Sequence, residues 1–205
     1  VYLYQRDWAN ASLQATDLIE NSSTYSLVTD LDSVFLANSR EAIWQLKPVQ
    51  PGYNTNEGSL FILNTVPYYY ALNPSLTDAF ETDDLRRRHW VDSVIVGTIS
   101  YYYPFKYRIS DGSTVTEYSM MFRLAEQYLI RAEAEAQQNH LIAAATDLNV
   151  IRSRAGLPNI TVSDQSSLLQ AILQERRVEL FTEGSHRWLD LKRSGAIDSL
   201  MNPAA

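Results

Sequence analysis

Residues 122–158, FRLAEQYLIRAEAEAQQNHLIAAATDLNVIRSRAGLP, are the stretch of the chain that decides its fold. Apolar residues recur in it every three or four positions, which is the spacing of helices with one buried face. The first helix is expected to close at Asn139, with a buried face of Leu124, Tyr128, Ala132 and Ala136. The second is expected to stop at Gly156 and Pro158, with a face of Leu141, Ala144, Leu148 and Ile151. The stretch predicts two antiparallel helices joined by a tight turn.

Residues 168–195, LLQAILQERRVELFTEGSHRWLDLKRSG, predict two more helices. The first of them should run from about Ser166 to Glu183 and stop at Gly184. Its apolar stripe is expected to consist of Leu169, Ile172, Leu173 and Leu180. The second is short and carries Trp188 and Leu191.

The beginning of the chain predicts one further helix, which ends near Asn21. Its buried face is expected to consist of Tyr4, Trp8, Ala11, Ala15 and Leu18. Small residues on such faces let neighbouring helices approach closely, as the paired helices of tetratricopeptide repeats do. We therefore expect a mainly α fold, a tetratricopeptide-like (TPR-like) α-α superhelix with an irregular loop and a small β-hairpin insertion.

The helical pattern is interrupted between residues 41 and 118. Residues 41–47 alternate between apolar and polar and predict a strand, with Trp44 in the core. Residues 48–74 show no period and are punctuated by Pro, Gly and Asn, so they predict a long loop. Loops of this length inside a compact domain are usually functional or disordered, and the aromatic residues here make disorder the less favoured choice.

The end of this interruption predicts short regular elements. Ser75, followed by Asp78, predicts the start of a short helix that runs to about Phe80. Residues 91–118 are rich in β-branched and aromatic residues and predict a small hairpin region with a turn at Asp111-Gly112.

Composition places the chain among single-domain proteins. It has 205 residues, of which 45% are apolar, and this is enough for one core. We expect one domain over residues 1–205: the end of a helical repeat region (1–40), a strand, loop and hairpin region (41–118) and the helical region (119–195). A net charge of -7 argues against nucleic acid as a partner. No apolar stretch approaches the ~20 residues that span a bilayer.

Catalytic and metal-binding patterns are absent from the sequence. There is no cysteine, and His89, His140 and His186 lack the spacing of a helical metal site. The charged residues between 175 and 190 have the spacing of ion-paired helix faces rather than of an acid and base pair. We interpret them as a structural ion-pair network formed by Glu133, Arg176, Glu179 and Arg187. The sequence therefore predicts no enzyme, no metal and no cofactor.

Aromatic residues are the best functional signal, because the chain has 13 Tyr, 4 Trp and 6 Phe. In the loop between residues 53 and 70 they alternate with amides, and a Tyr ring can stack on the apolar face of a sugar while amides bond its hydroxyls. The candidate ligand-binding residues are Tyr53, Asn54, Tyr68, Tyr69 and Tyr70, with Tyr102 from a second tyrosine run as an alternative.

Four motifs, LAEQYLIRAEAEA, LNVIRSRAGLP, ERRVELFTEG and HRWLDLKRSG, each resemble the corresponding motif of the SusD/RagB family. Members of that family are surface lipoproteins that capture glycans or peptides for a partner transporter in the outer membrane. The resemblance implies TPR-like helices on one side and irregular loops that carry the ligand site on the other. Family members are typically more than twice this length, so the chain is expected to be a carboxy-terminal portion of a single SusD/RagB-like domain.

The resemblance implies glycan capture at the cell surface, for import through a SusC-like TonB-dependent transporter during polysaccharide utilisation. Membrane attachment would be through a lipid anchor outside this sequence. Peptide capture, as in RagB-like members, is an alternative within the family. A TPR-type scaffold that binds only a protein partner is an alternative from another class.

Overall fold

The computed structural model describes residues 1–112, 114–161 and 164–198. The chain divides into two compact units. The helical unit comprises Val1–Glu20, Glu126–Arg152 and Asn159–Ala205, and the loop unit comprises Asn21–Ala125 and Ser153–Pro158. This division does not test the single domain expected over residues 1–205, which stays a prediction.

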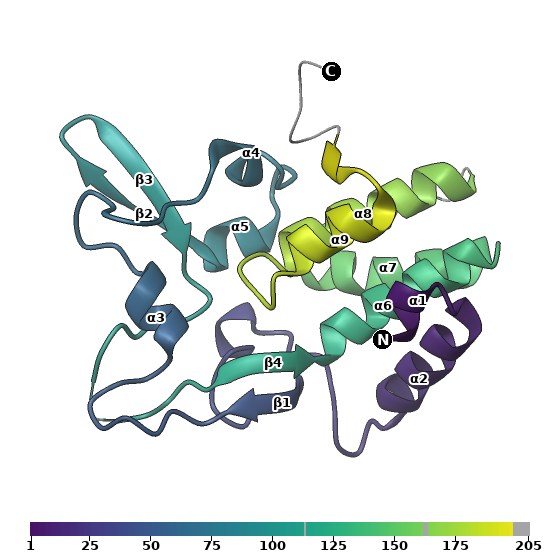
Figure 1. The fold of residues 1–205 in the computed structure, drawn as a ribbon, viewed down its shortest axis with the longest axis horizontal. Helices are drawn as coiled ribbons and strands as arrows, with labels where there is room; N and C mark the ends of the chain where they lie inside the picture. Colours follow the sequence, from purple (N-terminus) through teal and green to yellow (C-terminus); the bar gives the residue numbers. More distant parts are fainter. Residues whose placement is uncertain (113, 162–163, 199–205) are drawn as a thin grey trace. The chain divides into compact units, whose positions relative to one another are not determined.

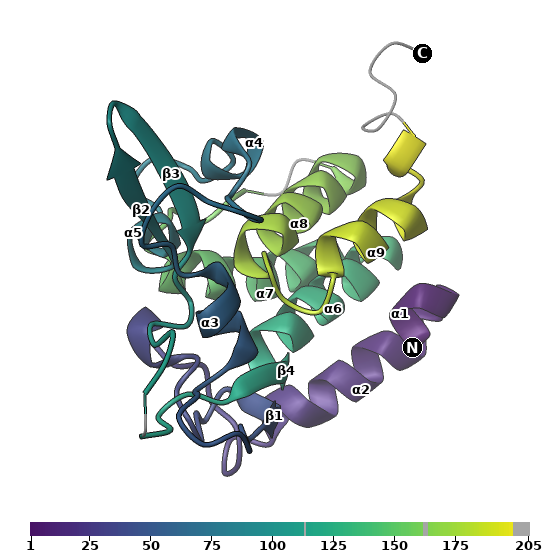
Figure 2. The same cartoon turned by 60° about the vertical axis from the view of Figure 1, so that its left-hand side comes forward.

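The helical unit holds the helices that the sequence pattern predicted. Their bounds are α1 (Tyr2–Gln5), α2 (Trp8–Glu20), α6 (Leu124–Gln137), α7 (Leu141–Arg154), α8 (Gln165–Glu179) and α9 (His186–Ser194). The first residues of α6 and the last of α7 belong to the loop unit. Figures 1 and 2 show α6, α7 and α8 side by side. The mainly α prediction is confirmed.

Small residues and positive-φ turns account for this helical packing. The alanines on the predicted apolar faces are fully buried, namely Ala132 and Ala136 in α6 and Ala144 in α7. The turn between α6 and α7 closes at Asn139 in the left-handed conformation, with φ 64°. The stop after α7 is Gly156, with φ 76°. These turns agree with the sequence prediction.

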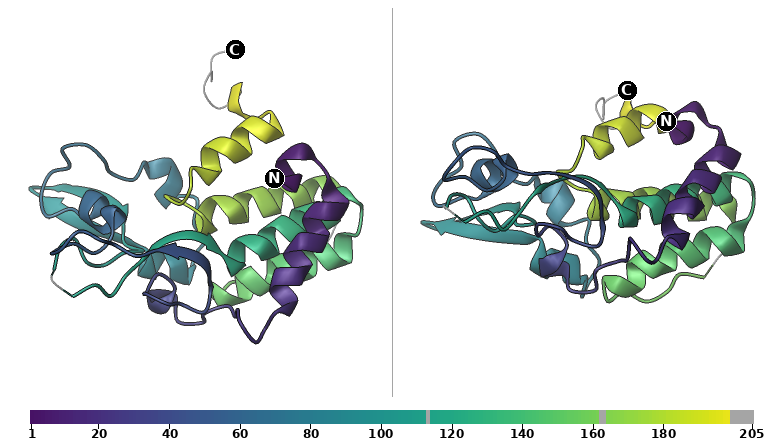
Figure 3. Two further views of the ribbon diagram at one scale, coloured as in Figure 1. Left: turned by 60° about the horizontal axis from the view of Figure 1, so that its bottom comes forward. Right: turned by 90° about the horizontal axis from the view of Figure 1, so that it is seen from below.

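The opening helix is broken, whereas one continuous helix was expected. Arg6 adopts a left-handed conformation with φ 59°, and a new helix begins at Trp8. The reason is a cap: the Asp7 carboxylate accepts a hydrogen bond from the backbone N–H of Asn10 at 3.2 Å. Ala11 and Ala15 are buried as predicted, and Arg131 of α6 donates to the Thr16 hydroxyl at 3.2 Å. Figure 3 shows α2 alongside α6 from two further directions.

The loop unit contains two small antiparallel sheets. Strand β1 (Ala42–Leu46) pairs with β4 (Ser119–Arg123), and β2 (Val91–Val96) pairs with β3 (Ile99–Pro104). Short helices connect them: the 3-10 helix η1 (Leu31–Ser33), α3 (Asn56–Phe61), α4 (Pro74–Thr77) and α5 (Leu85–His89). The strand over residues 41–47, a short helix near residue 75 and the presence of a hairpin were predicted, whereas β4 was not, because it has no clear alternating pattern.

The core of the loop unit is aromatic and ionic. The Phe35 ring lies 5.7 Å from that of Trp90 and 5.2 Å from that of Tyr107. The indole N–H of Trp90 donates to the Leu31 carbonyl at 2.9 Å. Beside these rings the fully buried Glu41 carboxylate lies between two guanidinium groups, those of Arg123 at 2.9 Å and Arg154 at 2.6 Å. Paired charges can occupy a core because each offsets the desolvation of the other.

Several local expectations for the loop unit were wrong. Trp44 is 49% exposed rather than in the core, because register irregularities on both sides of it break the alternation of β1. The hairpin turns at Gly97, with φ 64°, and not at Asp111-Gly112. The short helix after residue 73 is capped by the Asn73 side chain rather than by Ser75, since Asn73 accepts from the Ser75 N–H at 2.9 Å.

The long loop over residues 48–74 also contains a helix that was not foreseen. The Thr55 hydroxyl caps α3 by accepting a hydrogen bond from the Gly58 N–H at 3.1 Å. Gly58 fits because a Cβ there would lie only 2.3 Å from the Ile109 carbonyl oxygen. A six-residue helix has too few turns to show a period in the sequence.

Candidate functional site

Three consecutive tyrosines form an exposed aromatic surface in the loop unit. Tyr68, Tyr69 and Tyr70, here called the tyrosine ledge, are 86%, 76% and 53% exposed. The first two rings meet edge to face with centroids 4.4 Å apart, and the second and third lie 6.0 Å apart. Since these rings pack on one another and leave most of their surface open, they are not part of a core.

Backbone pairing fixes where the tyrosine ledge lies. The N–H of Leu72, two residues after Tyr70, donates to the carbonyl oxygen of Tyr102 in β3 at 2.7 Å. In Figures 1 and 2 this segment runs beside the β2–β3 hairpin before it enters α4. The Arg87 guanidinium of α5 lies over the Tyr102 ring, 4.7 Å from its centroid. The structure therefore brings Tyr102 next to the segment that carries the ledge.

Tyr53 and Asn54 lie elsewhere in the loop unit. They help to line a cavity of about 250 Å³ formed mainly by residues 46–50 and 53–56. Tyr53 is 43% exposed, and no described contact joins it to the tyrosine ledge.

The Asn54 amide is used inside the fold. Asn54 is only 2% exposed; its side-chain NH2 donates to the Thr114 carbonyl at 3.0 Å, and its oxygen accepts from the N–H groups of Thr116 at 2.8 Å and Glu117 at 3.2 Å. These bonds argue against direct contact between Asn54 and a ligand. Its side-chain amide instead fixes the part of the loop that carries Tyr53.

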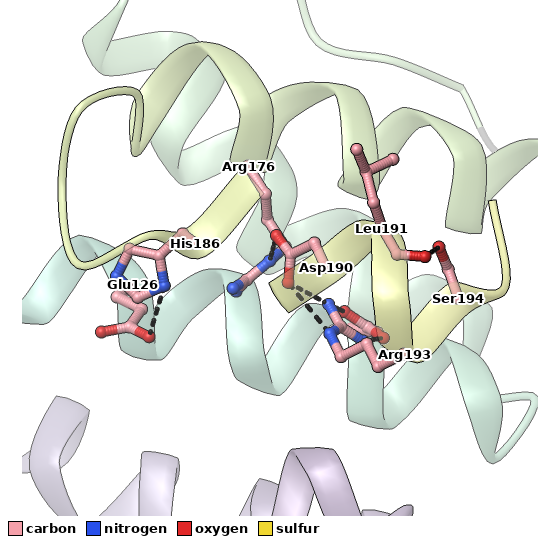
Figure 4. Close-up of polar contacts among 8 residues, drawn as sticks. Glu126, Arg176, His186, Asp190, Leu191, Arg193 and Ser194 are labelled. Atoms are coloured by element: carbon pink, nitrogen blue, oxygen red, sulfur yellow. Dashed lines mark hydrogen bonds and ion pairs between the residues drawn. The ribbon is translucent and has the colours of Figure 1, made fainter. Parts of the chain in front are cut away.

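A buried ion-pair cluster joins α6, α8 and α9 in the helical unit (Figure 4). The Arg176 Nε donates to Asp190 at 2.8 Å, and Arg193 donates to Asp190 at 2.8 Å and to Glu133 at 2.7 Å. Two members of the predicted network, Glu133 and Arg176, are thus connected through Asp190 and Arg193. Asp190 and Arg193 were not predicted as members of this network, although their spacing of three residues on one helix was a usable signal.

The other two members of the predicted network lie on the same two helices. Glu179 is fully buried on α8, and Arg187 is half-buried on α9. Burial and the nearby Arg177 together lower the pKa of Arg187.

Electrostatics keep Asp190 ionised. Burial alone would raise the pKa of Asp190, but Arg176 and Arg193 hold it below its ordinary value. A carboxylate in this state is no proton donor near neutral pH. The neighbouring His186 imidazole lies 3.6 Å from Glu126. Across the described ranges, His, Asp and Glu side chains do not gather in groups of three or more that could hold a metal ion.

Comparison with known proteins decides the family. The profile of the SusD family matches residues 70–204. The chain belongs to the SusD family. A SusD-like protein from Formosa agariphila is 34% identical over 93 residues, which make up 41% of this chain and 18% of that protein. The family that the four sequence motifs indicated is therefore confirmed.

Solved structures of the SusD family have the same fold. A SusD-like carbohydrate binding protein from Bacteroides vulgatus matches with 26% identity and a TM-score of 0.74, over 94% of this chain and 43% of that one. Surface glycan-binding protein A from Bacteroides uniformis matches with 23% identity and a TM-score of 0.73, over 96% of this chain and 48% of that one. The chain spans less than half the length of these SusD relatives, and their fold confirms the TPR-like helical class.

The names of these SusD relatives describe binding rather than catalysis. They agree with the prediction that the chain is not an enzyme. Among the residues that the structure describes, no helix combines the length and the apolar character needed to cross a membrane.

Proposed function

We propose that this chain is part of a surface protein that binds oligo- or polysaccharide through the tyrosine ledge. Membership of the SusD family supports this, as do relatives named for carbohydrate or glycan binding. The observation that carries the proposal is the exposure of three adjacent, mutually packed tyrosine rings, Tyr68, Tyr69 and Tyr70. Contiguous exposed aromatic surface on a folded protein marks an interaction site.

The chemistry of the ledge suits a sugar. A tyrosine ring offers a flat apolar face that can cover the C–H face of a pyranose, and its hydroxyl can bond to sugar hydroxyls at the rim. Apolar contact stabilises the complex by about 25 cal/mol for each Å² of apolar surface removed from water. Rings that already pack on one another lose little side-chain freedom when a ligand arrives. The proposed mechanism is capture, with no covalent bond broken.

The bound glycan would be passed to a partner, a SusC-like TonB-dependent transporter. In this proposal the protein acts at the cell surface, on the outer membrane. The family supports this part of the proposal, because SusD-like relatives include proteins named as surface glycan-binding proteins.

Affinity electrophoresis tests the proposed function. The chain is run through native gels that contain soluble α- and β-glucans, fructans, mannans, xylans or pectins, beside the triple variant Y68A/Y69A/Y70A. We expect retardation by at least one glycan, and loss of that retardation in the triple variant without loss of folding measured by circular dichroism. Tyr2→Ala is the matched control, because Tyr2 is a 40% exposed tyrosine in the helical unit. Equal retardation of the triple variant and the wild type would overturn the proposed site.

The two alternatives, peptide capture and a protein-binding scaffold, predict different results for the same experiment. Peptide capture predicts retention by peptides and none by glycans. A scaffold that binds only a protein would use the helical unit, where a cavity of about 280 Å³ is lined by Trp8, Arg6, Gln137, Glu133, Leu169, Leu173, Arg193 and Ser194. Trp8→Ala would then abolish partner binding, and the tyrosine variant would not.

A further inference from the structure

Arg87 lies over the ring of Tyr102, whose carbonyl oxygen accepts from the segment that follows the tyrosine ledge. The Arg87 guanidinium rests 4.7 Å from the centroid of the Tyr102 ring. Within the part of the chain that the structure describes, no carboxylate or carbonyl bonds to that guanidinium. Arg87 is half-buried, so its side chain is restrained while part of the residue stays open to solvent. A partly exposed positive charge held against an aromatic ring is a recognition group for an anion.

Asp84, the acidic residue that caps α5, is already paired with Arg86. The Asp84 carboxylate accepts from the Arg86 Nε at 3.0 Å and from Nη2 at 2.8 Å, and both side chains are almost completely buried. The same carboxylate caps α5 through the Arg86 backbone N–H at 2.9 Å. The Asp84–Arg86 pair therefore stabilises the helix, and the charge of Arg87 is left over.

The backbone on both sides of Arg87 is fixed. Before it, the Leu85 N–H donates to the Ala155 carbonyl at 2.9 Å. After it, Trp90 is 1% exposed and leads directly into β2. Because β2 pairs with the strand that carries Tyr102, the cation and the ring beneath it belong to one anchored structure. The guanidinium is preorganised by this framework, which lowers the entropy lost when it binds.

The nearest acidic side chain on the hairpin faces the other way. Tyr102 is paired with Ser93, whereas Asp92 is paired with Tyr103. Adjacent strand residues project to opposite faces, so Asp92 and Tyr103 share one face and Tyr102 and Ser93 share the other. The Tyr103 hydroxyl donates to Asp92 at 3.1 Å on that opposite face. Asp92 therefore does not compete for Arg87.

We propose that the glycan bound by the tyrosine ledge is acidic, and that Arg87 binds an oxyanion on it, either a sugar carboxylate or a sulfate ester. This inference rests on the proposed function and names its substrate class. A guanidinium whose face lies on a ring still offers two parallel N–H groups at its edge, which match the two oxygens of a carboxylate or sulfate. The ledge covers the apolar face of a sugar ring, and Arg87 selects for the charge.

Paired glycans that differ only in charge test this inference. De-esterified polygalacturonate and its methyl-esterified form share one backbone, and a sulfated galactan and its desulfated form give the second pair. Affinity electrophoresis and calorimetry are run on each glycan with the wild-type chain. We expect the charged member of at least one pair to bind about tenfold or more tightly than its neutral form, as a charge-assisted bidentate contact would produce. Preference within the first pair indicates carboxylate, and within the second, sulfate.

Three arginine variants separate the fixed cation from general charge. R87Q should lower affinity for the charged glycan about tenfold and leave affinity for the neutral form unchanged. R87K keeps the charge but loses the planar fork, so its affinity should fall between those of R87Q and the wild type. R88Q is the matched control, because Arg88 is exposed on the same helix and no described ring lies under it; its affinity should equal the wild-type value.

The outcomes separate this inference from the proposed function. If charged and neutral glycans bind equally and the triple tyrosine variant binds neither, glycan capture stands and the acidic class is overturned. If R87Q and R88Q weaken binding equally, the specific role of Arg87 is overturned. If no glycan of either kind is retained, the proposed function fails, and the inference fails with it. Retention of acidic peptides alone also overturns both.

Discussion

Both units of this chain bury charged groups in pairs, but the loop unit also carries a run of adjacent exposed tyrosines. In the helical unit, charged groups are buried in pairs, as in the cluster of Arg176, Asp190, Arg193 and Glu133, and alanines on the helices are fully buried. In the loop unit, aromatic rings are left open, and Tyr68 and Tyr69 are 86% and 76% exposed. The helical unit uses its buried pairs to hold its helices together, and the loop unit adds an exposed aromatic surface to a buried core of its own.

This difference indicates where family identity and ligand choice reside. The matched motifs fall largely on helices whose faces are buried, so they report on packing. The exposed tyrosines lie in an irregular loop and Arg87 lies in a five-residue helix, and neither segment shows a repeating apolar pattern. Surface loops on a rigid scaffold can change their side chains without a large loss of stability.

The largest loss of stability is expected when Asp190 is replaced in the buried cluster of the helical unit. D190A should reduce the free energy of unfolding by about 3–5 kcal/mol, because removing one partner leaves a buried guanidinium uncompensated. Asp190 is 3% exposed and contacts two arginines, and the Nη atoms of Arg176 already have no described hydrogen-bond partner. Urea unfolding followed by circular dichroism measures the change. Asp17→Ala is the control, since Asp17 is exposed on α2 and should unfold like the wild type; equal stability of both variants would show that the cluster contributes nothing.

A smaller effect should follow from overfilling the helix contact. A132L should cost about 1–3 kcal/mol, because Ala132 is fully buried and extra methyl groups would force the helices apart. Ala143 is exposed on α7, so A143L should change stability by less than about 0.5 kcal/mol. Thermal unfolding of the two variants side by side makes the measurement. Similar melting temperatures would contradict close packing at Ala132.

In the loop unit the corresponding loss should be smaller again. T55A removes the cap of α3 and should cost about 1 kcal/mol, the usual value for a lost N-cap hydroxyl. Thr98 is exposed in the turn between β2 and β3, so T98A is a suitable control. Denaturant unfolding measures the free energy of unfolding of both variants. Equal values for T55A and T98A would show that the Thr55 cap does not stabilise the fold.

The mildest change is expected in the pH dependence of stability. The folded-state pKa of Asp190 is held below the ordinary value, so its charge stabilises the fold at pH values above about 4, and this contribution is lost as pH falls further. The stability gap between the wild type and D190N should therefore narrow between pH 5 and pH 3. Urea midpoints at each pH report the gap, and a constant gap would show that the Asp190 charge is not involved.

The helices of the helical unit could be predicted from its sequence, although α8 ends at Glu179 rather than Glu183 and buries Leu168 rather than Leu169. The loop unit could be predicted only in outline. Buried faces repeat every three or four residues over α6, α7 and α8, so their existence and their stops at Asn139 and Gly156 followed from spacing alone. The break at Arg6 was missed because the Asp7 cap lies inside an uninterrupted apolar pattern. The register irregularities around Trp44 were missed because bulges depend on the partner strand β4, in which the distant residue Phe122 pairs with Trp44.

The same limit applies to the candidate site residues: local patterns could be predicted, and contacts with residues distant in the sequence could not. Exposure of the tyrosine ledge could be anticipated from a run of rings in an aperiodic loop. Burial of Asn54 could not, because its hydrogen-bond partners lie 60 to 63 residues away in sequence. The role of Arg87 could not be predicted either. Asp84, Arg86 and Arg88 are its neighbours in the sequence, and only the structure shows that the Asp84 carboxylate bonds to Arg86.

Hydrogen exchange with and without bound glycan is the most direct test of the division between scaffold and site. A glycan that retards the chain in native gels is added at saturation, and amide exchange is followed by mass spectrometry. The account predicts slower exchange in residues 66–73 and 99–104, including the Leu72 amide that bonds to Tyr102, and unchanged exchange in α6 and α7. Slower exchange confined to α1, α2 and α6, around the cavity that contains Trp8, would contradict it and place the ligand on the helical unit.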